Sequence, residues 1–113
     1  MKRNMDLIKE IMLAIENDDF KAEIEGYNEQ EVLFHKKLLI DAGYLNGITH
    51  NDTSAARPTV AAAFIKDITW EGYDFLELLK DDEKFAFLKD IGKKLSLEAL
   101  KSATKIAITT ALT

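Results

Sequence analysis

The chain has 113 residues, of which 47% are hydrophobic, and its 15 basic and 20 acidic side chains give a formal net charge of −5. This length and composition predict one soluble globular domain over residues 1–113. The lack of cysteine excludes disulfides and thiolate zinc sites, and no apolar run approaches the roughly 18–20 residues of a membrane span. We therefore expect a cytoplasmic protein with no membrane partner.

The charge is distributed unevenly along the chain. Residues 1–83 carry 9 Lys and Arg against 18 Asp and Glu, whereas residues 84–113 carry 6 Lys against 2 acidic side chains. The acidic excess argues against tight, nonspecific binding to a polyanion. The basic end is either a solvated helical surface or a contact for an acidic or phosphate-bearing partner.

The first half of the chain predicts two helices joined by a short connection. Apolar side chains recur at helical spacing over residues 5–16, and Asn4 precedes them as an N-cap. Residues 18–26 alternate in polarity, which indicates a short extended piece or an irregular bridge. The second helix, 28–42, has the clearest start signal, because Asn28 and Glu31 have the spacing of a capping box.

The middle of the chain predicts two strands. Gly43 ends the second helix, Tyr44 and Leu45 begin a strand, and the pair Asn46-Gly47 is typical of a turn. The polar, nonperiodic stretch 49–59 predicts an exposed, mobile loop. Residues 60–68 are rich in β-branched and apolar side chains and predict the second strand.

The last part of the chain is helical in pattern. Thr69 caps a helix that begins at Trp70, and the pair Asp81-Asp82 marks a break before a short helix that Gly92 ends. A final helix is expected over 96–113. The element order predicts an α+β fold, a winged helix-turn-helix-like domain with additional C-terminal helices, in which 49–59 is the wing loop.

Four blocks of the sequence carry a family resemblance, namely MKRNMDLIKEIMLAIEN, HKKLLIDAGYL, ITWEGYDFLELLKDDEKF and LSLEALKSATKI. Together they resemble the domain of unknown function 2513 family, which is found in bacteria and their phages. The family usually has His where this chain has Tyr73 and Trp where it has Phe85. The resemblance implies a winged-helix-like fold and implies no catalytic residues.

The residues themselves offer little support for catalysis. The chain lacks a glycine-rich phosphate loop and the motifs Gly-x-Ser-x-Gly and His-Glu-x-x-His, so we expect a protein that is not an enzyme and has no cofactor or metal. His35 lies on the apolar face of its helix and is expected in the core. His50 is expected in the loop, without a second ligand nearby. Trp70 and Tyr73 are expected to be core or seam residues.

DNA binding would use the second helix as a recognition helix in the major groove. In that case Gln30 would read an adenine edge, Lys36 and Lys37 would contact phosphate or guanine, and Arg57 would act from the wing. The acidic and apolar side chains on the same helix argue against this role. Fold analogy favours a DNA-binding transcriptional regulator of bacterial or prophage origin, and the alternative is a protein-interaction module that ignores DNA.

The apolar stripe of the final helix must be covered. Leu97, Leu100, Ala103, Ala107 and Ile108 recur at helical spacing along it. This stripe would pack either on the helix 5–16 of its own domain or on a second copy in a twofold dimer.

Overall fold

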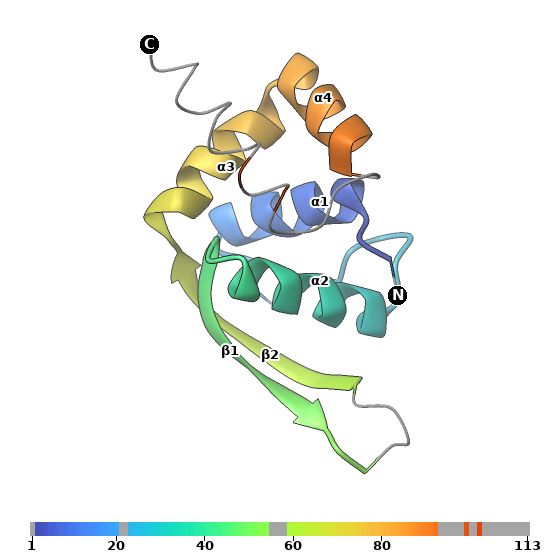
Figure 1. The fold of residues 1–113 in the computed structure, drawn as a ribbon. Helices are drawn as coiled ribbons and strands as arrows, with labels where there is room; N and C mark the ends of the chain where they lie inside the picture. The colour runs from blue at the N-terminus through green and yellow to red at the C-terminus, as the bar shows by residue number, and fades with distance from the viewer. Residues whose placement is uncertain (1, 21–22, 55–58, 93–98, 100–101, 103–113) are drawn as a thin grey trace.

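The computed structural model describes residues 2–20, 23–54, 59–92, 99 and 102. In this part of the chain the fold is α+β, with four helices and one two-stranded antiparallel sheet. The elements in order are α1 (Met5–Glu16), α2 (Glu29–Asp41), β1 (Leu45–Asp52), β2 (Thr59–Ile68), α3 (Trp70–Lys80) and α4 (Asp82–Gly92). Figure 1 shows α1 between α2 on one side and the pair α3 and α4 on the other.

Helix α1 forms the centre of the core and has the bounds that the sequence predicts. The Asn4 side chain accepts hydrogen bonds from the backbone N–H groups of Asp6 and Leu7, at 3.0 and 3.3 Å, so two of the free donors at the helix start are satisfied. The apolar face is buried against all neighbouring helices. Its members are Met5, Leu7, Ile8, Ile11, Met12 and Ile15.

The segment 17–28 connects α1 to α2, and the structure describes its residues 17–20 and 23–28. None of its described residues lies in a helix or a strand, so of the two expected alternatives the irregular one is found. The chain turns at Asp18 and Gly26, which have φ values of 60° and 87°. We call the segment 17–28 the bridge below.

Helix α2 begins with the predicted capping box. The Asn28 side chain accepts from the Glu31 N–H at 2.9 Å, and the Glu31 carboxylate accepts from the Asn28 N–H at 3.4 Å. The helix ends where Gly43 adopts a φ of 83°, in the left-handed region that favours glycine. The predicted helix 28–42 is thus confirmed to within its cap residues.

The two strands form a hairpin that packs with one face on α2. The predicted loop 49–59 is too long, because residues 49–52 belong to β1 and Thr59 begins β2. His50 therefore lies in a strand and not in a loop. The expected turn at Asn46-Gly47 is also wrong, since both residues lie in β1 beside a register shift. Gly47 is needed there because a Cβ would lie 2.4 Å from the Phe64 carbonyl oxygen.

The hairpin joins the helices at a narrow neck, where its first and last residues meet. Leu45 pairs with Ile68, and the Thr69 N–H donates to the Tyr44 carbonyl at 3.1 Å. The Thr69 hydroxyl donates to the Gly43 carbonyl at 2.6 Å and accepts from the Gly72 N–H at 2.9 Å. One side chain thus joins the end of α2 to the start of α3.

Helices α3 and α4 complete the core above α1. Phe75 stacks on Tyr44 at a ring distance of 4.2 Å, and Leu88 brings α4 into the same buried cluster. The predicted break is confirmed, since Asp81 ends α3 and its side chain accepts from the Lys84 N–H at 3.0 Å. None of the helices that the structure describes has both the length and the apolar composition to cross a bilayer.

The predicted final helix, 96–113, lies outside the described residues except for Ala99 and Ser102, which are helical. The expectation that it packs on α1 or forms a dimer therefore stays a prediction.

Candidate functional site

The helix predicted to read DNA presents few free cations. Gln30 is exposed near the start of α2, as expected. Lys37 is partly exposed, but its ammonium lies 2.6 Å from the Asp41 carboxylate one turn further on. The charge of Lys37 is therefore partly neutralised by its own helix.

Lys36 was expected on the outer face of α2, and this expectation is wrong. Its side chain is only 9% exposed, and its ammonium donates to the Phe20 carbonyl of the bridge at 3.0 Å. Burial lowers the pKa of Lys36, and the nearby Asp19 carboxylate opposes this shift. Lys36 holds the bridge against α2 and is not available to a phosphate on the surface.

The described parts of α2 and the hairpin present an acidic surface. Two hydrogen bonds from Ser54 lower the pKa of the exposed Asp52, which keeps it ionised. Arg57, the expected wing contact, lies outside the described residues. On these elements the charged side chains that are at least partly exposed are the carboxylates of Glu29, Glu31, Asp41, Asp52 and Asp67 and the ammonium groups of Lys37 and Lys66.

Large apolar side chains are exposed on the hairpin. Ile48 and Phe64 are paired across the strands on the face turned away from α2, and they are 60% and 58% exposed. The His50 ring packs edge-on against Phe64 at 5.7 Å on the same face. This apolar face has no partner among the residues that the structure describes.

Helix α3 carries a second exposed apolar stripe. Trp70 is 85% exposed and Tyr73 is 55% exposed, so the expectation that they lie in the core or a seam is wrong. The reason is geometric. Leu79 is fully buried nine residues after Trp70, and at about 100° per residue the two lie on opposite sides of the helix. We call Trp70 and Tyr73 the α3 stripe.

His35 lies in the core, as the sequence predicts, at 1% exposure. Its Nε2 accepts from the Asn4 N–H at 2.8 Å, and its Nδ1 donates to the Glu31 carbonyl at 2.7 Å. This pairing requires the neutral ring protonated at Nδ1, because the first partner is a donor and the second an acceptor. Burial lowers the pKa of His35, although its contacts with Glu31 oppose the shift. Both ring nitrogens are therefore occupied by hydrogen bonds to the backbone.

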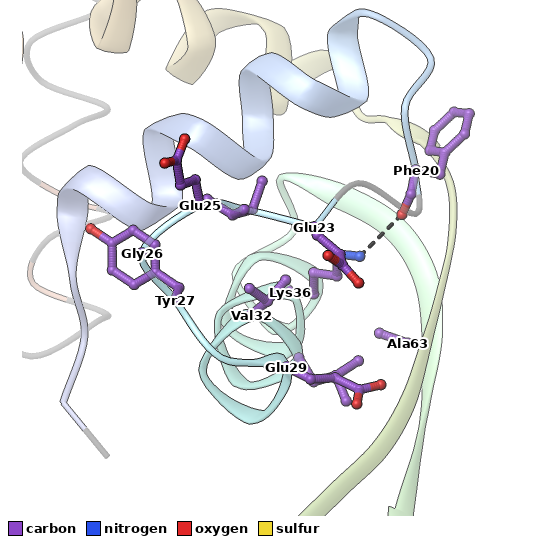
Figure 2. A pocket seen from close by; sticks show the side chains of 11 residues that line it. Phe20, Glu23, Glu25, Gly26, Tyr27, Glu29, Val32, Lys36 and Ala63 are labelled. Atoms are coloured by element: carbon purple, nitrogen blue, oxygen red, sulfur yellow. Dashed lines mark hydrogen bonds between the residues drawn. The ribbon is translucent and has the colours of Figure 1, made fainter.

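A cavity of about 900 Å³ lies between the bridge, α2 and β2. Figure 2 shows Lys36 reaching across it toward Phe20, with Glu23 and Glu29 at its edge. Its apolar wall is formed by Val32, Leu33 and Ala63. The sequence gives little signal for this cavity, because its walls come from three elements whose packing is not local.

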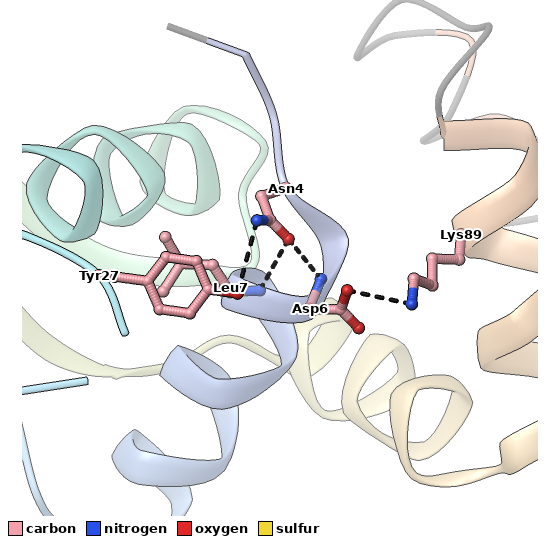
Figure 3. Close-up of polar contacts among 5 residues, drawn as sticks. All are labelled: Asn4, Asp6, Leu7, Tyr27 and Lys89. Carbon is pink, nitrogen blue, oxygen red and sulfur yellow. Dashed lines mark hydrogen bonds and ion pairs between the residues drawn. The ribbon is translucent and has the colours of Figure 1, made fainter. Parts of the chain in front are cut away.

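Polar contacts at the start of α1 hold one wall of this cavity in place. The Asn4 amide donates to the Tyr27 hydroxyl at 3.5 Å, which ties the bridge to α1 (Figure 3). Asp6 forms an ion pair with Lys89 of α4 at 3.0 Å. A single capping turn is therefore linked to both the bridge and α4.

The comparisons with known proteins give a family. A family model described as "Hypothetical protein (DUF2513)" matches residues 2–98. An uncharacterized protein of Haemophilus influenzae is 28% identical over 118 residues, and the alignment covers 96% of each chain. None of the solved structures matches. Because the family model matches most of its length, the chain belongs to the DUF2513 family.

Proposed function

We propose that this protein is a protein-interaction module built on a winged-helix-like scaffold, and that it acts by binding and not by catalysis. The scaffold is supported by the order of its elements, in which α2 is followed directly by the hairpin and then by α3. The absence of catalysis is supported by His35, whose two ring nitrogens are both bound to backbone groups.

The observation that carries this proposal is the character of the exposed surface. The two lysines of α2 are buried or paired, whereas Trp70 is 85% exposed. Exposed aromatic side chains of this size are typical of protein interfaces, where Trp and Tyr contribute much of the binding energy. A DNA-reading helix needs free cations for phosphate, and α2 has few.

The partner is tested by using the protein as bait in cells of its own host. We expect a defined protein to be recovered with the wild type and lost with the double variant Trp70→Ser/Tyr73→Ser. Phe87→Ser is the matched control, because Phe87 is 56% exposed on a different helix. Circular dichroism checks that each variant is folded. If the recovered protein is lost equally with Phe87→Ser, nonspecific hydrophobic adsorption, and not the α3 stripe, explains its recovery.

DNA binding is the second candidate, favoured by the helix-then-hairpin order and by the exposed Gln30. Fluorescence anisotropy with labelled random duplexes tests it at about 50 and 200 mM salt. We expect no saturable binding. An affinity that falls steeply with salt and is lost in Gln30→Ala/Lys37→Ala would establish DNA binding and overturn our preference.

A further inference from the structure

The cavity beside the bridge combines three kinds of surface. Its wall is apolar, because Val32 and Leu33 are buried in it and Ala63 is half-buried. Its edge is acidic, because Glu23 and Glu29 are exposed there. Neither carboxylate has an ion pair or a hydrogen bond with any other described residue. A ligand that fills this cavity should therefore bring an apolar group together with positive charge.

The third surface is the ammonium of Lys36. It lies on the cavity at 9% exposure, and within the described ranges its one hydrogen-bond acceptor is the Phe20 carbonyl. An ammonium has three donors, so it can donate to a further acceptor such as a carbonyl oxygen. A small anion would satisfy Lys36 but would meet the carboxylates of Glu23 and Glu29.

From this geometry we infer that the cavity is a docking groove for a basic, apolar peptide segment of a protein partner. An aliphatic side chain of the peptide packs on Val32, Leu33 and Ala63. Lys or Arg residues on either side of it pair with Glu23 and Glu29, and a peptide carbonyl accepts from Lys36. A peptide supplies all three groups along one chain, and the volume of about 900 Å³ suits a segment of a few residues. This groove is separate from the α3 stripe, so the two sites can be tested independently.

The test uses three fluorescein-labelled peptides, Gly-Lys-Leu-Lys-Leu-Lys-Gly, Gly-Glu-Leu-Glu-Leu-Glu-Gly and Gly-Lys-Ser-Lys-Ser-Lys-Gly, with the full chain. We expect saturable binding of the first alone. In Glu23→Gln/Glu29→Gln the affinity should fall about fivefold, which is the order expected for two exposed ion pairs. The control Glu71→Gln/Glu77→Gln makes the same change of net charge on α3, and it should leave the affinity unchanged.

The location is tested on the wild type by amide chemical shifts during the peptide titration. We expect the changes to be concentrated at Ile24, Tyr27 and Ala63, and this measurement decides the matter if the double variant does not fold. The inference is overturned if the acidic or the serine peptide binds as well as the first, or if no peptide binds. It is also overturned if the control weakens binding equally or if the shifts cluster on the α3 stripe.

Discussion

The Thr69 hydroxyl is expected to be a major determinant of how the hairpin is attached. It accepts from the Gly72 N–H at 2.9 Å as the N-cap of α3 and donates to the Gly43 carbonyl at 2.6 Å. Loss of a Thr cap costs typically about 1 kcal/mol. Loss of a second neutral hydrogen bond adds about 0.5–1.5 kcal/mol, at the lower end here because water can reach the Gly43 carbonyl. Thr69→Val, which keeps the shape of the side chain, should therefore lower the free energy of unfolding by about 1.5–2 kcal/mol.

The assay is urea unfolding followed by circular dichroism, with Thr69→Ser as the matched control. Serine keeps the hydroxyl and removes a methyl group, so its free energy of unfolding should stay within about 0.5 kcal/mol of the wild type. The slope with urea should be the same in all three proteins, because the surface exposed on unfolding does not change. A valine variant as stable as the wild type, or a serine variant as unstable as valine, would refute the assigned role of the hydroxyl.

Three further changes test other parts of the fold. Asn28→Ala should lower the free energy of unfolding by about 0.5–2 kcal/mol through loss of the α2 cap, and a urea midpoint equal to that of the wild type would contradict this. Gly72→Ala should destabilise the protein by about 2 kcal/mol despite the better helix propensity of alanine, because the new Cβ would lie 2.0 Å from the Tyr44 carbonyl oxygen; thermal unfolding measures this. Stability should fall as the pH drops below about 6.5, because the pKa of His35 is lower in the folded chain than in the unfolded chain, which takes up the proton first. His35→Gln should reduce this pH dependence in urea titrations, and an unchanged dependence would show that the Asn4 N–H contact does not hold His35 neutral.

Local signals predict the helices well, because each described helix begins with a side chain that caps its free N–H groups. The caps Asn4, Asn28 and Thr69 all accept hydrogen bonds from the first turn that follows them, as their positions in the sequence indicate. The left-handed Gly43 ends α2 where it was expected. Signals of this kind depend on residues at most four positions apart, so they can be found without knowledge of the tertiary structure.

Most of the features that sequence reasoning missed depend on contacts between distant residues, and the exposure of Trp70 is the exception. The strand β1 is polar and contains Asn46-Gly47, and it is a strand because the apolar β2 pairs with it over its whole length. Lys36 is buried because the bridge folds over it. Its spacing of four residues from Val32 and three from Leu39 places it on the buried side of α2, but lysine is usually exposed, so the contact with the bridge could not be predicted from this spacing. Trp70 was assigned to the core because large aromatic side chains are usually buried. Its angular distance from Leu79 was the available signal for its exposure.

The way the hairpin is attached to the helices determines where its length can change. The two strands enter and leave the helical body at Leu45 and Ile68, and one face of the hairpin packs on α2. Only the part of the hairpin beyond these contacts can change length and leave the core unchanged. Residues added in matched pairs at its far end would extend its reach by about 3.4 Å for each pair and would leave the core contacts unchanged. An insertion between β1 and β2, or an engineered tag placed there, should therefore change what the protein contacts at a distance at only a small cost in stability.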